Sequence, residues 1–501
     1  MSGFVQLFEK LSHKYANNIS IIFNEQGFTY NQINIASNRL AQGLMDIGFR
    51  KGDRIALILP NYVQFPICYF ALLKIGVVAF PINFLFNEIQ IHELLGRANV
   101  KGIITWEQVA KKVQQAAQGL ELKSPLIILG ENIPDNSIDL TKLIASSQPI
   151  THPLESDDED TAIILHTSAT TNEPKAVELS HKNLYSNCTA FREHFLINSD
   201  DCIIAVTPLF HPLGITAVLN TGFCFGAKIN LHPYFKPQSI LNSLKNQKVT
   251  LFVGIPSIYK ALMDFEDSGD SFESMRFCIS SWQPLSESLI ESFENKFNKV
   301  IYEAYGLAEA TAFVSINRVD HEQKSGSVGM PLNQVAVKII NEQDNDVPTG
   351  EIGEIVVRGP NVMKGYIGQP QQTEAVLQGD WLHTGDMGKI DENGTLYFIE
   401  RKENVITKGG FHVFPREIET HLLKHPKVKE AVVLGHPDPI QGQEVKACIV
   451  PKNGNVLAPN EIIDYCQEAF AVYKCPKIVQ FYETFPKSST GKILRYKLKQ
   501  E

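Results

Sequence analysis

Cysteine is sparse in this chain, and the patterns in which it binds metals or builds disulfide frameworks are missing. Eight cysteines are scattered through 501 residues, and none of them belongs to a C-x-x-C pair. This usage favours a reducing compartment with buried free thiols, and it argues against a disulfide framework and against a zinc site. The N-terminal residues also lack a basic segment followed by a long apolar one, so we expect no signal peptide.

Long apolar runs and an excess of positive charge are lacking as well. No run of about eighteen apolar residues occurs, so no membrane-spanning helix is predicted. The formal net charge of −9 argues against a general nucleic-acid-binding surface. We therefore expect a cytoplasmic protein that has neither a nucleic-acid partner nor a transmembrane segment.

The composition that remains is that of an ordinary globular protein, with 44% hydrophobic and 20% charged residues. A chain of 501 residues exceeds what one core usually serves, so two or more domains are expected. Apolar strand patterns alternate with helical ones, which predicts β-α-β units and a mostly parallel sheet. Helices are expected at 1–20, 33–47, 69–75 and 91–97, and strands at 28–30, 54–59, 77–82 and 102–105. The polar stretch 130–160 is expected to be a loop.

The middle of the chain continues the alternation. Several of its expected strands end in turns that carry polar residues, and ligands bind at the carboxyl ends of strands in open α/β sheets. These strands are expected at 203–206, 251–255, 277–280 and 301–305. From 327 to 398, short strands alternate with Gly-rich turns, which suggests a small β-rich subdomain.

A different composition begins near residue 400. Residues 400–404 form a charged patch with little core potential, and we place a domain boundary there. The tail that follows has an α+β pattern, with helices expected at 415–425 and 459–469 and strands at 428–434, 445–450 and 478–481. From Val405 onward, fourteen Lys and Arg face ten Asp and Glu, so this module carries +4 on an otherwise acidic chain.

One stretch, 163–182, combines an apolar strand, a cluster of hydroxyl residues and a lysine. Backbone N–H groups, hydroxyls and an ammonium group together can hold phosphate oxygens. The same residues also make ordinary Ser/Thr-rich turns, and the segment alone fits both interpretations. It is not a Walker P-loop, because no G-x-x-x-x-G-K-S/T pattern occurs, and Gly491-Lys492 is followed by Ile493.

The order of motifs along the chain resembles the adenylate-forming superfamily, which includes acyl-CoA synthetases, peptide-synthetase adenylation domains and luciferases. The likeness covers essentially the whole chain and is strongest to fatty-acid–CoA ligases. Segment 167–175 stands at the place of the phosphate loop T-S-G-T-T-G-x-P-K-G. Other matches are Leu73–Gly76 with Pro81–Asn83, Pro208–His211, Tyr305–Glu309 for Y-G-x-T-E, Gly379–Asp386 for G-W-x-x-T-G-D, Arg401–Glu419 at the hinge, and Pro486–Arg495 for P-K-T-x-x-G-K-I-L-R.

The resemblance implies an α/β fold with a large N-terminal domain of two α/β subdomains and a small β-rich subdomain. A small mobile α+β C-terminal domain would follow. The corresponding boundaries are 1–400 for the AMP-binding domain, 401–404 for the hinge and 405–501 for the domain that carries the adenylation lysine.

It also implies a two-step reaction that uses ATP, Mg²⁺, and CoA or a phosphopantetheine carrier. A carboxylic acid would attack ATP to give an acyl-adenylate and pyrophosphate, and a thiol would then displace AMP. The implied catalytic residues are Lys492, Glu309 and His211, with Thr167 and Glu309 as metal contacts. The implied nucleotide and cofactor contacts are Thr167, Ser168, Thr170, Thr171, Lys175, Gln283, Pro284, Tyr305, Gly306, Asp386 and Arg401, with Gly409 and Gly410 beside the pantetheine arm.

Several of these residues also have ordinary structural explanations. Taken alone, Glu309 fits a carboxylate at a helix N-terminus, Asp386 fits a turn, and Lys492 fits a solvated basic tail. His211 also fits a core or loop position. The agreement of the motifs in order is what favours the functional interpretation.

The chain departs from the family pattern at positions that bear on activity. Ala169, Asn172 and Ala176 stand where the phosphate loop usually has glycine, and Ala308 replaces the threonine of Y-G-x-T-E. Asn404 and Glu403 replace the usual hinge residues. Ser281-Trp282-Gln283-Pro284 stands where G-G-A-P is common, so Trp282 is either a plug of the acyl pocket or a core aromatic.

Three functions follow from these observations. The first is a ligase that joins an acid, expected to be a fatty acid, to CoA. The second is a ligase for an acyl carrier protein, whose acidic surface the basic tail would suit, as it would also suit the phosphates of CoA. The third is a degenerate member that binds nucleotide with little turnover, which Ala169 and Ala308 suggest.

Overall fold

The computed structural model describes residues 4–167, 174–265, 270–321, 323–452, 454–487 and 493–499. The chain forms two compact units. Of the described residues, the first comprises those within 4–167, 174–337 and 357–382, and the second comprises those within 338–356 and 383–499. The second unit thus contains both the predicted hinge at 401–404 and the predicted C-terminal domain, and the boundary at 401–404 stays a prediction.

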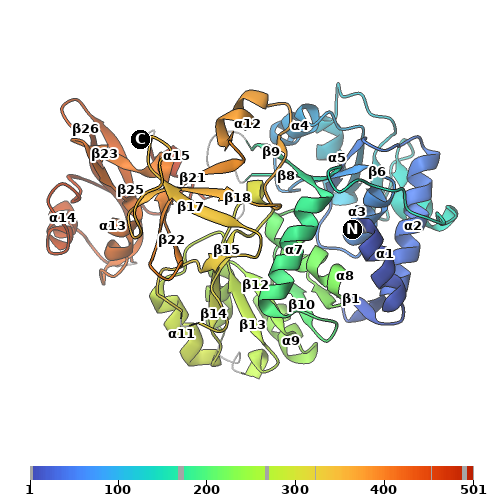
Figure 1. Cartoon of the computed structure of the whole chain (residues 1–501), viewed down its shortest axis with the longest axis horizontal. Coiled ribbons are helices and arrows are strands. Elements are labelled where there is room, and N and C mark those ends of the chain that lie inside the picture. Colours follow the sequence, from blue (N-terminus) through green and yellow to red (C-terminus); the bar gives the residue numbers. More distant parts are fainter. Residues whose placement is uncertain are drawn as a thin grey trace. The chain divides into compact units, whose positions relative to one another are not determined.

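The first unit contains an eight-stranded sheet built mainly from β-α-β connections (Figure 1). Six of its strands, β8, β4, β3, β5, β6 and β7, run parallel to one another. The strands β9 and β19 pair antiparallel at one edge. In spatial order they are β19 (Gly365–Tyr366), β9 (Ala176–Ser180), β8 (Thr161–His166), β4 (Val78–Pro81), β3 (Arg54–Ile58), β5 (Gly102–Trp106), β6 (Ile127–Leu129) and β7 (Ile138–Asp139). The helices that alternate with them are α2 (Tyr30–Asp46), α3 (Gln64–Lys74), α4 (Glu88–Arg97), α5 (Glu107–Ala116) and α6 (Leu140–Ser146).

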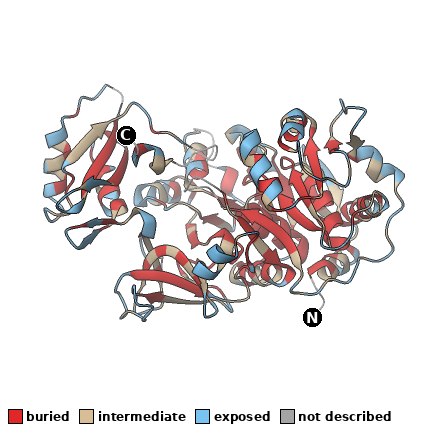
Figure 2. Ribbon diagram, turned by 90° about the horizontal axis from the view of Figure 1, so that it is seen from above, coloured by how far each residue is buried: buried red, intermediate tan, exposed pale blue. Residues whose placement is uncertain are grey.

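A nine-stranded sheet forms the rest of this unit, and its six central strands are parallel. In spatial order they are β16 (Met330–Pro331), β15 (Ser315–Ile316), β14 (Ile301–Tyr305), β13 (Phe277–Ser280), β12 (Leu251–Gly254), β10 (Cys202–Ala205), β11 (Lys228–Leu231), β1 (Ile19–Phe23) and β2 (Gln26–Thr29). The accompanying helices are α1 (Phe4–Lys14), α7 (His181–Phe195), the π-helix η1 (Gly214–Asn220), α8 (Thr221–Phe225), α9 (Pro237–Asn246), α10 (Pro256–Met263) and α11 (Glu287–Phe297). The six central strands consist largely of buried residues, as expected for a sheet covered on both faces, and Figure 2 draws buried residues in red.

A five-stranded sheet and a helix account for the region that the sequence marked as β-rich. The strands are β17 (Ala336–Ile340), β18 (Gly353–Arg358), β20 (Leu377–Gln378), β21 (Trp381–Ile390) and β22 (Leu396–Arg401), with α12 (Pro370–Val376) before β20. The tail forms a second five-stranded sheet of β23 (Ile406–Lys408), β24 (Phe411–Val413), β25 (Val428–Asp438), β26 (Gly442–Pro451) and β27 (Ile478–Phe481). Its helices are α13 (Pro415–Leu422), α14 (Pro459–Gln467) and α15 (Arg495–Lys499).

The predicted fold class is confirmed: the chain has a mixed α/β fold with a large N-terminal and a small C-terminal domain. All eight cysteines are buried and free, as the sequence predicted. Among the helices of the described residues, none is both long and apolar enough to cross a membrane.

Three local expectations were wrong. The stretch 130–160 is not wholly a loop, because β7 and α6 lie within it, and the Asp139 carboxylate caps the helix by accepting from the Lys142 N–H at 3.0 Å. The first helix ends at Lys14, and β1 begins at Ile19. The charged patch 400–404 includes a buried residue, Glu400, whose carboxylate accepts the Arg416 N–H at the start of α13.

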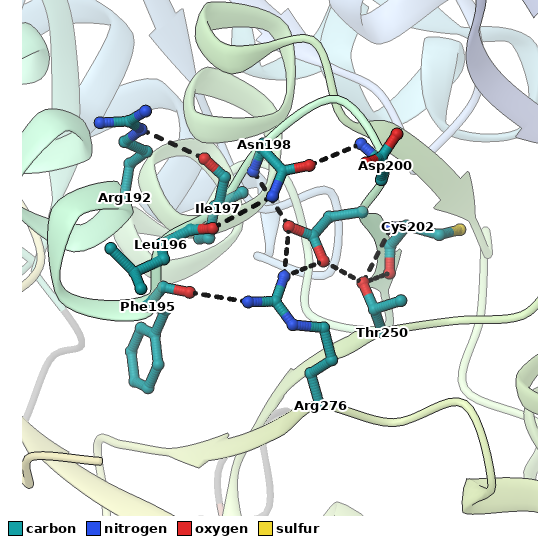
Figure 3. Close-up of polar contacts among 10 residues, drawn as sticks. Arg192, Phe195, Leu196, Ile197, Asn198, Asp200, Cys202, Thr250 and Arg276 are labelled. Carbon is teal, nitrogen blue, oxygen red and sulfur yellow. Dashed lines mark hydrogen bonds and ion pairs between the residues drawn. The ribbon is translucent and has the colours of Figure 1, made fainter. Parts of the chain in front are cut away.

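A buried carboxylate, Asp201, joins the end of α7 to three strands of the nine-stranded sheet, and Figure 3 shows its partners. Arg276 donates to both of its oxygens at 2.6 and 2.7 Å, the Thr250 hydroxyl donates at 2.7 Å, and the Asn198 N–H donates at 3.0 Å. Arg276 also donates to the carbonyl of Phe195 at 3.3 Å. The charge of Asp201 is thus removed from water but fully paired.

Replacing Arg276 with Gln should destabilise the protein by about 3 kcal/mol, because Asp201 would keep a buried charge without its partner. This is the lower end of such costs, since the guanidinium group is partly exposed. The matched control is Arg318→Gln, which breaks an exposed pair with Asp320 and should change the unfolding midpoint far less. Thermal unfolding of the full chain measures both, and equal shifts would contradict the structural role given to Asp201.

Candidate active site

The antiparallel pair β8–β9 holds the two ends of the hydroxyl-rich segment. The Thr167 N–H donates to the Lys175 carbonyl at 2.9 Å, and the Lys175 N–H donates to the Thr167 hydroxyl oxygen at 3.0 Å. Two of the predicted phosphate contacts are therefore fixed side by side, where β8 ends and β9 begins. The other predicted residues of this segment lie outside the described residues: Ser168, Ala169, Thr170, Thr171 and Asn172.

Glu309 lies in a tight turn that follows β14. Gly306 leaves no room for a side chain, because a Cβ there would lie 1.6 Å from a neighbouring main-chain carbonyl oxygen. The Met363 N–H donates to the Glu309 carbonyl at 2.8 Å, which fixes the turn against the segment before β19. Tyr305 is buried and Glu309 half-buried, so the carboxylate is held in place without being removed from solvent.

Tyr366 in β19 connects Glu309 to Lys175. Its hydroxyl donates to Oε1 of Glu309 at 2.8 Å, and the Lys175 Nζ lies 4.6 Å from the centroid of its ring. The sequence analysis did not single out Tyr366. One partner, Lys175, immediately precedes β9, and the other, Glu309, lies in a turn 57 residues away, so no local pattern marks it. A group suited to phosphate and a group suited to a metal ion therefore contact one tyrosine.

His211 and Trp282 come from loops after β10 and β13, and their rings meet edge to face at 4.4 Å. The side chain of Asn61 fixes the His211 loop, because its amide oxygen accepts from the Leu209 N–H at 2.8 Å. Trp282 has a φ of +70°, a left-handed conformation that bulky residues rarely adopt. The predicted catalytic residue His211 thus contacts Trp282, which replaces one of the small residues of the G-G-A-P pattern.

Burial lowers the pKa of His211 to about 3, and the neighbouring His166 adds to the effect. The pKa of His166 is itself lowered to about 4 by burial. His211 is therefore a neutral imidazole near pH 7. It can pack against an acyl chain or make one polar contact, but it brings no positive charge to a carboxylate.

Gln283 and Pro284 directly follow Trp282, and they are half-buried and exposed, respectively. The Ser281 hydroxyl donates to the Ala304 carbonyl at 2.9 Å, which ties this loop to the end of β14. Because β13 and β14 are parallel neighbours, the predicted nucleotide contacts in both loops share one edge of the sheet.

Asp386 and Arg401 lie opposite each other in β21 and β22 of the second unit. The Nε of Arg401 is 2.8 Å from Oδ1 of Asp386, whose side chain is buried. Gly409 and Gly410 form the turn between β23 and β24 with φ values of +56° and +84°, which favours glycine at both positions. The predicted catalytic residue Lys492 lies outside the described residues.

The residues of the described chain suit Mg²⁺ bound together with a substrate. They include no cluster of three or more His, Cys, Asp or Glu that could hold a metal ion alone. Mg²⁺ is commonly bound by one or two carboxylates, waters and substrate phosphates instead of an all-protein cage. The Glu309 carboxylate and the Thr167 hydroxyl are oxygen donors of the kind that such a site needs.

Comparison with known proteins identifies the class. The chain matches the family of AMP-binding enzymes over residues 8–367 and the AMP-binding enzyme C-terminal domain over residues 417–492. The chain therefore belongs to the AMP-binding enzyme family, which confirms the resemblance to adenylate-forming enzymes.

Relatives and solved structures match nearly the whole chain. A long-chain-fatty-acid–CoA ligase from Bacillus subtilis is 32% identical over 519 residues, covering 97% of this chain and 92% of the relative. An oxalate–CoA ligase from Arabidopsis thaliana is 30% identical, covering 99% of this chain and 97% of the relative. The crystal structure of ATP-bound MatB from Rhodopseudomonas palustris superimposes with a TM-score of 0.92 at 27% identity, covering 99% of this chain and 98% of that one.

Acid should destabilise the protein partly through His211. The unfolded side chain has a pKa of about 6.5 and takes up a proton at a pH where the folded one stays neutral, so stability falls as the pH drops from about 6.5 toward 4. His211→Gln should reduce this loss, measured as the melting temperature from pH 7 to 4.5. The control His412→Gln changes an exposed histidine and should leave the loss unchanged. An unaltered slope in His211→Gln would contradict the lowered pKa.

Proposed function

We propose that this protein is an ATP-dependent acid–thiol ligase that activates a carboxylic acid, expected to be a fatty acid, and transfers it to CoA. The observation that supports the proposal most directly is the contact of Lys175 and Glu309 with the same tyrosine. It brings an ammonium group suited to phosphate and a carboxylate suited to a metal ion close to one side chain. Membership of the AMP-binding enzyme family supports the use of ATP, and the CoA ligases among the relatives support the class of reaction.

In the first step a carboxylate oxygen attacks the α-phosphorus of ATP, and the bond to the pyrophosphate oxygen breaks. Negative charges crowd together in this step, and Mg²⁺ supplies charge neutralisation when bound. Glu309 and Thr167 would hold the ion, and Lys175 would bind phosphate oxygens, with Ser168, Thr170 and Thr171 beside it. Lys492 would lie between the attacking carboxylate and the α-phosphate.

The nucleoside would be held by residues from several loops. Tyr305, Gly306, Gln283 and Pro284 would contact the adenine side. Asp386 would accept hydrogen bonds from the ribose hydroxyls, and Arg401 would donate to the ribose or phosphate. In the second step a thiolate attacks the acyl carbon and AMP leaves, with Gly409 and Gly410 beside the pantetheine arm.

The acid and the thiol acceptor are the finer parts of the proposal. Relatives of similar identity are named for a long-chain fatty acid and for oxalate, so family membership leaves the acid open. A phosphopantetheine carrier protein is the alternative acceptor, and the +4 charge of the tail from Val405 onward suits an acidic carrier as well as the phosphates of CoA.

Exchange of labelled pyrophosphate into ATP, measured with a panel of aliphatic and aryl acids, tests the activation step. We expect exchange with at least one aliphatic acid, followed by thioester formation with CoA. Lys492→Ala should lose exchange but still form thioester from a supplied acyl-adenylate, because the lysine is assigned only to the first step. Absence of exchange with every acid would favour a nucleotide-binding member with little turnover.

Trp282→Gly should admit longer or bulkier acids if the indole ring limits the acyl pocket. Glycine also suits the φ of +70°, so the variant should fold. Trp282→Phe is the matched control, because it retains an aromatic ring at the same backbone position and should keep the original preference. The kcat/KM for acids of increasing chain length measures the effect, and an unchanged preference in Trp282→Gly would exclude the plug.

A further inference from the structure

Tyr366 lies between two groups of opposite charge that the proposed function assigns to Mg²⁺ and to phosphate. Its hydroxyl donates to Oε1 of Glu309 at 2.8 Å, and its ring faces the Lys175 ammonium at 4.6 Å. We propose that Tyr366 is a positioning residue, which orients the Glu309 carboxylate toward the metal ion and holds Lys175 for the nucleotide phosphates. This inference rests on the proposed function, and it assigns a role to a residue that lies outside the phosphate-loop and Y-G-x-T-E motifs.

The main chain holds Tyr366 firmly enough for such a role. Tyr366 pairs with Val177 across β19 and β9, and the next residue, Ile367, donates its N–H to the Ala176 carbonyl at 2.9 Å. The Tyr366 N–H donates to the Thr373 hydroxyl oxygen at 2.9 Å. The side chain is buried, with 7% of its surface exposed. The ring is therefore fixed next to Lys175, which immediately precedes β9.

The hydroxyl group restricts how Glu309 can bind a metal ion. It takes one lone pair of Oε1, so Oε2 is the oxygen that it leaves more open to the ion. Mg²⁺ requires near-ideal octahedral geometry, so the direction of a ligand carboxylate matters. Partners that orient a ligating carboxylate typically contribute about tenfold or more to metal affinity.

The ring acts on Lys175 in a different way. An aromatic face attracts an ammonium group electrostatically. It has no lone pair that would accept a conventional hydrogen bond from the N–H groups. The N–H donors of Lys175 therefore remain able to turn to phosphate oxygens. A carboxylate in the same place would compete with phosphate, whereas the ring restrains the ammonium without neutralising it.

Two variants separate these roles. Tyr366→Phe removes the hydroxyl and keeps the ring, and Tyr366→Leu removes both. Binding of ATP to the full chain is measured by titration calorimetry over a series of Mg²⁺ concentrations. For Tyr366→Phe we expect the Mg²⁺ concentration at half-maximal binding to rise about tenfold, with ATP affinity at saturating Mg²⁺ within twofold of the unchanged protein. Tyr366→Leu should show the same rise and a further loss of ATP affinity of about threefold.

The control is Tyr302→Phe, which removes a hydroxyl from a half-buried tyrosine on β14 and should leave both quantities unchanged. An unaltered or lower Mg²⁺ requirement in Tyr366→Phe would overturn the role of the hydroxyl. Equal ATP affinity in the Phe and Leu variants at saturating Mg²⁺ would overturn the role of the ring. Melting temperatures of all variants show whether a loss comes from unfolding, and Tyr366→Phe preserves the shape of the packed ring.

Pyrophosphate exchange, measured in parallel, keeps this inference separate from the proposed function. If the unchanged protein binds ATP with Mg²⁺ but catalyses no exchange, the proposed function fails and the role of Tyr366 is still decided by binding. If exchange is normal and Tyr366→Phe has an unaltered Mg²⁺ dependence, only the role of Tyr366 fails. If the unchanged protein binds no ATP in the presence of Mg²⁺, both proposals are overturned.

Discussion

The antiparallel pairing of β19 with β9 is the constraint on which the candidate site in the first unit depends. It fixes a two-residue strand beside the segment that begins at Lys175. The residues just before that strand contact the Glu309 turn, because the Met363 N–H donates to the Glu309 carbonyl and the Thr311 hydroxyl donates to the Asn361 carbonyl. One short edge strand thus joins the β8–β9 hairpin to the turn that carries Glu309. The two motifs belong to different sheets, and this pairing is one of the contacts that join them.

Much of the fold could be predicted because it is encoded locally. The parallel strands are short apolar runs that end in Pro, Gly or polar residues, and the helices between them show clear periodicity, as at 33–47 and 91–97. The short helix α6 was missed because only seven residues form it and its start depends on one side chain, Asp139. The burial of Glu400 was missed because charge suggests exposure, whereas its carboxylate accepts the Arg416 N–H at the start of α13.

The site residues that belong to sequence motifs could be predicted, whereas a residue defined only by contacts between distant segments could not. Lys175, Glu309, Asp386 and Arg401 are marked by pattern, and the structure connects them within each unit: Lys175 and Glu309 through Tyr366, and Asp386 with Arg401 directly. Tyr366 carries no such mark, since its function would arise from two strands and a turn that meet only in the folded chain.

The glycine replacements that cast doubt on activity differ in their consequences. Ala176 is the first residue of β9, where it pairs with His166 in extended backbone, so its methyl group meets no left-handed strain. Ala308 is buried within the turn that carries Glu309, and the main-chain hydrogen bond from Met363 fixes that turn without a threonine hydroxyl. What the chain loses at Ala308 is one polar contact, not the placement of the carboxylate. These two departures therefore weigh less against turnover than the sequence alone suggested.

At Trp282, an unfavourable backbone conformation and a favourable ring contact act against each other. A bulky residue at a φ of +70° costs about 1–2 kcal/mol relative to glycine, and an edge-to-face ring contact such as that with His211 returns about 0.5–1.5 kcal/mol. The ring contact therefore offsets much of the backbone cost of placing tryptophan where the family pattern has a small residue. Both rings stand at the carboxyl edge of the nine-stranded sheet, in loops after β10 and β13. A large, half-buried ring at the edge where open α/β sheets bind ligands is consistent with the proposal that Trp282 limits the acyl pocket, and a difference at this position would let ligases of one fold differ in the acid they take.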